Sequence, residues 1–506
     1  MNNEMMASKQ SSSVYNDLRL EGKLMDAVIR VEGVEFNIHK IILCNCSPYF
    51  RALFTRCSDP ERKHKAYTYI SDNFEEVMSC EEFLQLSVQE LSDILGRDDL
   101  NVRKESTVYD AVLRWIAHIP KQREQHISVL LSKVRLTLTS EQYIRNNVIS
   151  HPLVKDNSEC LQIASNSIAI IGHFLRHRRS LVGVCNQLVR HRLPKVILLA
   201  IGGWSDDNST NGIEAYDIRA NCWINVENGL GCPRAYHGAV FLNGHVYCVG
   251  GYNGGVFYNN LDRFDLSTRT WHELTPMHRR RCNVSVTVLN GCIYAMGGKD
   301  RDVRLSSAER YRPEINQWSR IAPMNEPRSC AGCATLHNKV YICGGCDGID
   351  RLQTAECYNP ETDQWTEIAP MSVSRSGVGV IAYSDRVFAV GGFDGNTCLQ
   401  SAEAYNPQTN TWHTVSSMLT PRSNFGLEVI EDRLFVVGGY DGNIPTNYVE
   451  FYDAARDEWS EACDMAIDRN ALSCCVVSGL SNLTSYIIPR DTLPPLTLED
   501  ELEASS

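Results

Sequence analysis

The sequence predicts an all-β propeller of six blades over residues 195–479, preceded by a helical region. Two ladders of residues at a common spacing carry this prediction. Gly-Gly pairs begin at Gly202, Gly250, Gly297, Gly344, Gly391 and Gly438. A tryptophan recurs in step with them, at Trp223, Trp271, Trp318, Trp365, Trp412 and Trp459. Both ladders advance by 48 residues once and then by 47, which indicates repeated copies of one structural unit.

Each repeat is predicted to form four short strands, as in a kelch-type blade, whose repeats are about 50 residues long. The strand that ends in Gly-Gly is nearly all apolar, so we expect both of its faces to be buried between neighbouring blades. An aromatic residue stands seven residues before each tryptophan, with an acid two residues earlier still. We expect these aromatic residues to pack adjacent blades together while their polar tips reach hydrogen-bond partners.

An arginine ladder and the two ends of the repeat array complete the fold prediction. The arginines are Arg234, Arg281, Arg328, Arg375, Arg422 and Arg469. Because a guanidinium group suits carbonyl and carboxylate partners, we expect them to brace the blades. The first repeat begins directly with the apolar residues 196–201, and residues 469–477 form a strand without the rest of a repeat. The last strand should therefore complete the first blade and close the ring, which removes open sheet edges.

The composition limits the function. With 49 basic and 61 acidic residues, the net charge of −12 argues against nucleic acid or a membrane surface as the main partner. The first residues lack the basic start and apolar run of a secretory signal, and no stretch has the apolar length of a membrane span. We therefore expect a cytoplasmic protein whose 20 cysteines are reduced and mostly fill core positions.

The residues before the propeller predict a change to helical structure. Apolar residues recur at three- and four-residue spacing over residues 74–145, as expected for the core side of helices. Residues 24–54 combine alternating strand character with a helix-like end, as at the start of an α/β domain.

Motifs in both regions are similar to those of known domains. Asp26-Ala-Val-Ile, Phe36-Asn-Ile-His-Lys and Cys44-Asn-Cys-Ser-Pro-Tyr-Phe resemble the opening of a BTB domain. Phe83-Leu-Gln-Leu-Ser and Asp110-Ala-Val-Leu-Arg-Trp resemble a BACK domain. With the repeats behind them, the chain is identified as a member of the kelch-like (BTB-BACK-kelch) family. The resemblance implies a partial BTB segment, a partial helical BACK region, a basic linker, the propeller and a tail, at residues 14–55, 59–171, 172–194, 195–479 and 480–506.

This resemblance implies a non-catalytic substrate adaptor of a cullin-3 RING E3 ubiquitin ligase, without a cofactor. In the family the BTB domain dimerises and, with the first BACK helices, binds cullin-3, while the propeller captures the protein to be ubiquitinated. The repeats are most similar to those of a male germ-cell member, which implies a role in spermatogenesis.

The chain departs from the family pattern near its start. From Thr55 it passes almost at once into Asp59-Pro-Glu-Arg-Lys, so the later BTB helices and the start of BACK are missing. In the family those helices carry most of the cullin-binding surface. The alternative function is therefore a scaffold or cytoskeletal binding protein that does not bind cullin-3.

Loop positions that differ between blades are the candidates for partner recognition, the alternative being a merely solvated rim. The residue after each Gly-Gly varies, and we expect it in a loop, where a rigid scaffold displays its contacts. In similar propellers this position contacts ligand, together with the residue after the repeat arginine and one further along the loop. The predicted protein-binding residues are Trp204, Tyr252, Lys299, Arg304, Ser329, Arg351, Ser376, Phe393, Ser423, Tyr440 and Asn470. The basic members favour an acidic segment of an unidentified protein.

Three other patterns are interpreted conservatively. Cys330-x-x-Cys333 and Cys343-x-x-Cys346 have zinc-ribbon spacing, but residues three apart in a predicted strand point to opposite faces, so no metal is expected. The propeller histidines fall at scattered repeat positions, and no phosphate-binding glycine motif or nucleophile elbow occurs, which argues against an enzyme. The Arg- and His-rich residues 176–192 are expected to be a solvated linker, the alternative being a nuclear signal.

Overall fold

The computed structural model describes residues 27–31, 34–38, 67, 69–176, 190–205, 207–480 and 483–489. The chain forms two compact units, Met1–Val134 and Arg135–Ser506. Most of the predicted BTB segment lies outside the described residues. Its two described strands, β1 (Ala27–Val31) and β2 (Val34–Ile38), pair antiparallel, as the alternating pattern predicts for the first of them. Among the helices that the structure describes, none has the length and apolar character needed to cross a membrane.

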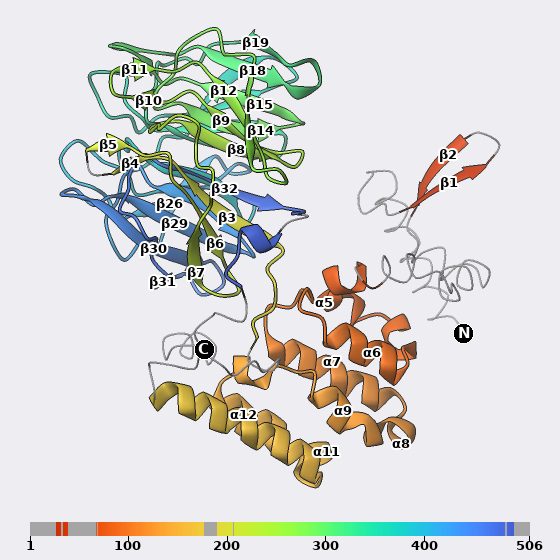
Figure 1. Ribbon diagram of the computed structural model, residues 1–506. Helices are drawn as coiled ribbons and strands as arrows, with labels where there is room; N and C mark the ends of the chain where they lie inside the picture. Colours follow the sequence, from red (N-terminus) through yellow and green to blue (C-terminus); the bar gives the residue numbers. More distant parts are fainter. Residues whose placement is uncertain are drawn as a thin grey trace. The chain divides into compact units, whose positions relative to one another are not determined.

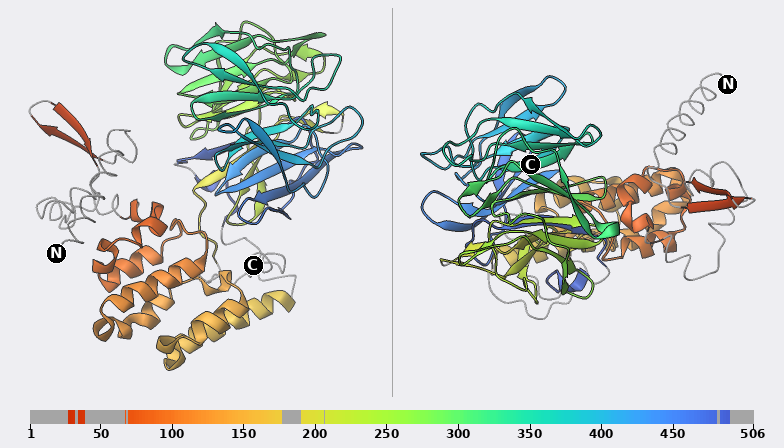
Figure 2. Two further views of the ribbon diagram at one scale, coloured as in Figure 1. Left: turned by 180° about the vertical axis from the view of Figure 1, so that it is seen from behind. Right: turned by 90° about the horizontal axis from the view of Figure 1, so that it is seen from above.

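The first unit contains short helices that follow the predicted apolar spacing. They are α5 (Phe74–Val77), η1 (Glu82–Gln85), α6 (Val88–Leu95), α7 (Glu105–His118), α8 (Pro120–Arg123), η2 (Glu124–His126) and α9 (Ile127–Leu131). Ser87 begins α6 with a capping box, in which the Glu90 carboxylate accepts a hydrogen bond from the Ser87 main-chain N–H at 2.9 Å. Leu91, Ile94 and Val108 are fully buried, so the predicted stripes form the core of this unit. The helices, in orange, pack side by side (Figure 2).

The second unit opens with further helical turns and one long helix. They are η3 (Leu136–Leu138), α10 (Glu141–Tyr143), η4 (Ile144–Ile149), α11 (Pro152–Lys155) and α12 (Ser158–Arg176). Residues 177–189, most of the predicted basic linker, lie outside the described residues. At its described end the prediction of a solvated linker is wrong, because His191 and Arg192 are buried.

Residues 195–480 form six four-stranded antiparallel sheets, as predicted, and we number them as blades in chain order (Figure 1). Blade 1 consists of β32 (Ser473–Ser478), β3 (Val196–Ile201), β6 (Ile213–Asp217) and β7 (Cys222–Asn225). Blade 2 consists of β8 (Gly238–Leu242), β9 (His245–Val249), β12 (Leu261–Asp265) and β13 (Thr270–Leu274). Blade 3 consists of β14 (Ser285–Leu289), β15 (Cys292–Met296), β18 (Ala308–Arg312) and β19 (Gln317–Ile321).

The remaining blades repeat this order. Blade 4 consists of β20 (Gly332–Leu336), β21 (Lys339–Cys343), β22 (Ala355–Asn359) and β23 (Gln364–Ile368). Blade 5 consists of β24 (Gly379–Tyr383), β25 (Arg386–Val390), β26 (Ala402–Asn406) and β27 (Thr411–Val415). Blade 6 consists of β28 (Gly426–Ile430), β29 (Arg433–Tyr440), β30 (Pro445–Asp453) and β31 (Glu458–Glu461). The second strand of each blade is buried almost throughout, as its apolar sequence predicts.

The ring closes through its two chain ends, which confirms the predicted closure. β3 pairs antiparallel with β32, from Val196 opposite Ser478 to Ile201 opposite Ser473, and the two strands lie side by side in Figure 1. The first strand of each blade contacts the first strands of both neighbouring blades, so these strands form the innermost circle. No sheet edge is left open at the point where the array begins and ends.

The predicted tail contributes to the core. After β32, η7 (Leu483–Ser485) leads into Tyr486, which is fully buried, and Ile487, which is 4% exposed. Both side chains belong to the apolar cluster that contains residues of blades 1 and 2. Residues 483–489 are therefore part of the folded propeller, which the sequence did not indicate.

Candidate functional site

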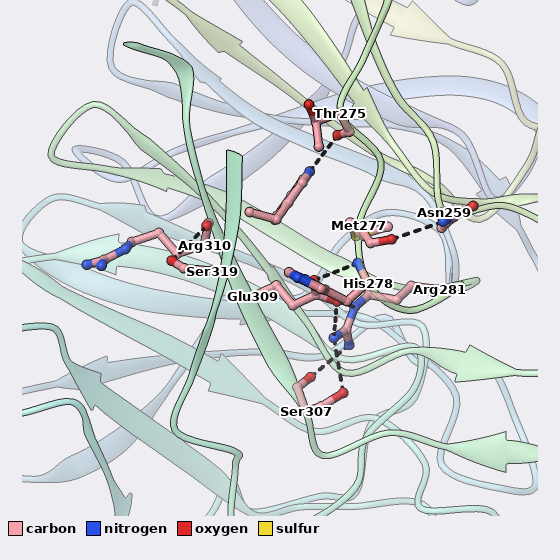
Figure 3. A network of polar contacts seen from close by, with 10 residues as sticks. Asn259, Thr275, Met277, His278, Arg281, Ser307, Glu309, Arg310 and Ser319 are labelled. Carbon is pink, nitrogen blue, oxygen red and sulfur yellow. Dashed lines mark hydrogen bonds and ion pairs between the residues drawn. The ribbon is translucent and has the colours of Figure 1, made fainter. Parts of the chain in front are cut away.

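The arginine ladder braces one end of every blade. In blade 3 the fully buried Arg281 guanidinium donates to the Gly297 carbonyl oxygen at 2.8 Å and to the Ser307 carbonyl oxygen at 2.7 Å. It also donates to the Glu309 carboxylate at 2.9 Å, which accepts in turn from the main-chain N–H of His278 (Figure 3). Equivalent pairs are Arg234–Asp262, Arg328–Glu356, Arg375–Glu403, Arg422–Glu450 and Arg469–Glu214. The predicted bracing role is confirmed, and the acid ladder supplies its partner.

The tryptophan ladder joins each blade to the one before it, and tyrosines contribute to five of these six contacts. The Trp318 indole N–H donates to the Thr275 carbonyl oxygen in the preceding loop at 2.9 Å. The Tyr311 hydroxyl donates to the Asn316 side-chain oxygen at 2.8 Å, and that oxygen also accepts from the Thr275 N–H. The ladders predicted to pack the blades therefore also hydrogen-bond them, which makes these positions architectural.

A closed circle of main-chain hydrogen bonds surrounds the propeller axis at the end where the Gly-Gly pairs lie. Its members follow the arginines by two residues: Tyr236, Asn283, Cys330, Gly377, Asn424 and Ala471. Each N–H donates to the carbonyl of the previous member, at 2.7–3.2 Å, and Tyr236 donates to Ala471. All six have φ between 51° and 63°, the left-handed region that turns the chain into the first strand. We call this end of the propeller the ring face.

Beside this circle, three chain segments of each blade pair as short β-bridges. The residue after the arginine pairs with the residue after Gly-Gly, and that residue pairs with one five positions further on. The six triples, in blade order, are Asn470–Trp204–Ser209, Ala235–Tyr252–Phe257, Cys282–Lys299–Arg304, Ser329–Cys346–Arg351, Ser376–Phe393–Cys398 and Ser423–Tyr440–Pro445. All of the predicted protein-binding residues belong to these triples, so the structure brings them together on the ring face.

Aromatic side chains gather on the triples of blades 1 and 2. The Trp204 ring stacks against the Tyr252 ring of the next blade, with their centroids 6.3 Å apart. The Tyr252 ring meets the Phe257 ring edge-on at 5.1 Å. All three side chains are partly exposed, so they present a continuous aromatic surface that spans two blades.

Basic side chains occupy the neighbouring blades 3 and 4. Lys299 pairs in register with Arg304 on the hairpin of β16 (Lys299–Asp300) and β17 (Val303–Arg304). The guanidinium carbon of Arg351 lies 5.8 Å from the centroid of the Phe393 ring. This contact joins a basic side chain of blade 4 to an aromatic side chain of blade 5. Arg279 in the adjoining loop is exposed and adds to the positive charge of this sector.

The triples also contain buried members. Ser329, Ser376 and Ser423 are 3%, 8% and 3% exposed, and their main chains are paired within the triples. They therefore offer little surface to a partner. The sequence prediction did not include Ser209, Phe257, Cys398 or Pro445, although their constant distance from Gly-Gly was a signal that could have identified them.

Aspartates hold the loops of blades 4, 5 and 6 in fixed conformations. In blade 4 the Asp347 carboxylate accepts from the Ile349 N–H at 2.7 Å and the Asp350 N–H at 2.8 Å, and these bonds lower its pKa. Asp394 and Asp441 make the same turn in the next two blades. These loops are thus ordered before any partner binds, which reduces the entropy lost on binding.

The cysteines of the apparent zinc motif occupy different structural elements. Cys330 lies in the ring-face circle and not in a strand, where the sequence analysis placed it, whereas Cys343 is fully buried in β21. Burial raises the pKa of Cys343 to about 12. Among the residues that the structure describes, no group of three or more His, Cys, Asp or Glu side chains is arranged to hold a metal ion.

Comparisons with known proteins agree with this architecture. The family model BACK, "BTB And C-terminal Kelch", matches residues 50–149. The "KLHDC2/KLHL20/DRC7 Kelch-repeats domain" matches residues 195–345, and the "Kelch motif" matches residues 327–372, 374–419 and 421–465.

Two curated kelch-like proteins are similar to part of this chain. Kelch-like protein 3 of Homo sapiens is 31% identical over 327 residues, which cover 48% of this chain and 55% of the relative. Kelch-like protein 28 of Homo sapiens is 29% identical over 371 residues, 56% of this chain and 64% of the relative. The chain spans about half the length of the first of these relatives. With its BACK match, its kelch matches and its closed six-bladed propeller, the chain carries the BACK and kelch domains that characterise the kelch-like (BTB-BACK-kelch) family.

Proposed function

We propose that this chain is the substrate-recognition adaptor of a cullin-3 RING E3 ubiquitin ligase, and that the ring face binds the target protein. The observation that carries the proposal is that recurring and varying positions of each blade have different structural roles. Positions that recur in every repeat form the buried arginine braces and the inter-blade contacts, whereas the triples differ between blades and include partly exposed side chains. Variable contacts on a rigid frame suit recognition of one protein and not a reaction.

The chemistry of the triples indicates the kind of target segment. Lys299, Arg304 and Arg351 would pair with acidic side chains, and the Trp204–Tyr252 stack would receive an apolar or aromatic side chain nearby. Guanidinium groups bind carboxylates through paired hydrogen bonds, so they add orientation as well as charge. We therefore propose a protein segment with both acidic and apolar side chains.

The link to the ligase rests on the N-terminal half. The BACK match at residues 50–149 and the similarity to kelch-like relatives support cullin-3 as the proposed partner, with homodimerisation through the BTB segment. We also propose a cytoplasmic location and, from the sequence resemblance, a role in male germ cells. The alternative is a non-catalytic scaffold or cytoskeletal binding protein, which needs only the propeller.

Co-purification with cullin-3 separates the two functions. The full chain is compared with a version in which a complete BTB segment from a kelch-like relative replaces residues 14–55. Capture of cullin-3 by both versions supports the adaptor function. Capture by the restored version alone identifies the chain as a propeller that binds its target without ubiquitination.

A further inference from the structure

Five of the six inter-blade contacts share one set of hydrogen bonds. In blade 4 the Tyr358 hydroxyl donates to the Asp363 carboxylate at 2.8 Å, and the same oxygen accepts from the Ala322 N–H of the preceding loop at 2.9 Å. We call this arrangement the Tyr–Asx bridge. The other four bridges are Tyr216–Asn221–Cys463, Tyr311–Asn316–Thr275, Tyr405–Asn410–Ala369 and Tyr452–Asp457–Ser416.

The contact between blades 1 and 2 has a different composition. Phe264 replaces the tyrosine and Arg269 replaces the Asn or Asp, so neither group of the Tyr–Asx bridge is present. The Trp271 indole N–H is 3.4 Å from the Asn228 carbonyl oxygen, whereas the five other tryptophans make this bond at 2.7–2.9 Å. Arg269 instead forms an ion pair with an exposed Glu227, a kind of interaction that contributes little.

Further features of the same contact reduce its stability. Asp262 takes the place of the longer glutamate, which in the other blades accepts a main-chain N–H of the entering loop, as Glu403 does from Ser372 at 2.9 Å. The repeat step here is 48 residues where the others have 47, so the connecting loop is one residue longer. His237 is buried in this region, and neither ring nitrogen has a hydrogen-bond partner.

Residues 483–489 bind at this contact. The Tyr486 hydroxyl donates to the Leu266 carbonyl oxygen of blade 2 at 2.7 Å. Tyr486 and Ile487 pack in one apolar cluster with members of both blades, among them Ile197 of blade 1 and Phe264 of blade 2. The segment thus supplies a tyrosine hydroxyl and apolar area where the repeat sequence lacks the Tyr–Asx bridge.

We propose that the contact between blades 1 and 2 is a peptide-binding surface whose ligand is this chain's own residues 483–489. The surface takes a short segment with a tyrosine followed by an aliphatic residue. The segment follows the last strand of the ring, and it is held by the buried side chains of Tyr486 and Ile487 and by the hydrogen bond from the Tyr486 hydroxyl. It can therefore be removed or exchanged without breaking a blade. Occupancy of the surface then sets how firmly blades 1 and 2 are joined.

Two truncations of the full chain test this proposal. Ending the chain after Pro489 keeps the segment, and ending it after Asn482 removes it. We expect the first truncation to leave the thermal midpoint of the propeller unchanged and the second to lower it by about 5 °C or more. A synthetic peptide with the sequence of residues 483–489 should restore the midpoint of the shorter chain, and a peptide with alanine in place of Tyr486 and Ile487 should not.

A designed bridge provides the second arm. Phe264→Tyr with Arg269→Asn installs the groups that the other five contacts share. In the chain with both substitutions, loss of residues 483–489 should lower the thermal midpoint by less than half of the fall seen without them. If the chain truncated after Asn482 does not fold, the same truncation with both substitutions should fold. Equal thermal midpoints for the two truncated chains would overturn the proposal. It would also be overturned if neither the designed bridge nor the native peptide reduced the fall in midpoint caused by removing residues 483–489.

Discussion

The Trp223 indole in blade 1 donates a hydrogen bond to the Cys463 carbonyl oxygen, 2.7 Å away in the loop after blade 6. It is the same bond that joins consecutive blades elsewhere, here made across the closure of the ring. Together with the pairing of β3 and β32, it makes the closing contact equivalent to the other strong ones. The weakest of the described inter-blade contacts therefore lies between blades 1 and 2 and not at the closure.

The tryptophan hydrogen bonds predict a graded effect of one substitution. Trp318→Phe keeps an aromatic ring but leaves the Thr275 carbonyl without its donor, so the free energy of unfolding should fall by about 1–2 kcal/mol. Trp271→Phe removes a longer, exposed bond and should cost less than half of that. Chemical denaturation of both variants measures the difference, and equal losses would contradict the inter-blade role of the bond.

The arginine braces predict a large loss from a single change. Arg375→Ala leaves the buried Glu403 carboxylate without its partner and should cost about 3–5 kcal/mol. Replacing both residues, Arg375→Met with Glu403→Leu, should recover much of this loss because no unpaired charge remains. Arg386→Ala removes an exposed arginine from the same blade and should change stability by less than about 0.5 kcal/mol. Denaturant midpoints of the three variants test the brace.

The buried His237 side chain should make the folded protein less stable in acid. Burial, with a further contribution from nearby Arg234, lowers the pKa of His237 to about 3. Between pH 6.5 and 3 the His237 imidazole is protonated in the unfolded chain and neutral in the folded chain. The free energy of unfolding therefore falls as the pH drops through this range, by up to about 1.4 kcal/mol per pH unit. His237→Val places a residue like Val284 or Val378 of other blades here, and its stability should depend less on pH below 6.5. Parallel pH profiles for both proteins would rule this out.

The Glu428 side chain should make the folded protein less stable as the pH rises. It lies on β28 near Cys474 and Cys475 of the neighbouring blade, and burial raises its pKa to about 8. From its unfolded pKa near 4.5 up to about pH 8, the folded chain holds a proton that the unfolded chain has lost, so stability falls as the pH rises. Glu428→Gln should remove this loss, whereas Glu367→Gln, at an exposed position, should not. Thermal midpoints at pH 5, 7 and 9, taken as rough sampling points across this window, measure it.

The propeller could be predicted because each blade repeats the same physical requirements. Gly-Gly, Trp and Arg recur at fixed spacing in every blade, and Tyr in five of the six; the arginines prove to be buried in equivalent braces, and the tryptophans make equivalent inter-blade contacts. The residue five positions after each tyrosine was equally periodic. Its role was not predicted, because a single Asn316 or Asp363 joins its own tyrosine to a main-chain N–H of another blade, and only the ring arrangement brings these groups together.

The candidate site was predicted in part for the same reason. Sequence reasoning located Trp204 and Lys299 in loops, but it could not show that each forms a triple with two other segments. The contribution of Tyr486 had no periodic signal at all, because residues 483–489 occur once and compensate for a defect in another blade. Features that depend on one departure from the repeat are visible only in three dimensions.

The most direct test of the ring face as the target-binding surface is a matched charge reversal. The first variant carries Lys299→Glu, Arg304→Glu and Arg351→Glu on the ring face. The second carries Arg312→Glu, Lys339→Glu and Arg386→Glu, which are exposed at the opposite ends of the blades and change the net charge equally.

Proteins that co-purify with each full chain from cells are then quantified by mass spectrometry. The proposed function predicts that partners of the unaltered chain are retained by the second variant and lost by the first. Retention of the same partners by both variants would contradict the assignment of the ring face as the binding surface.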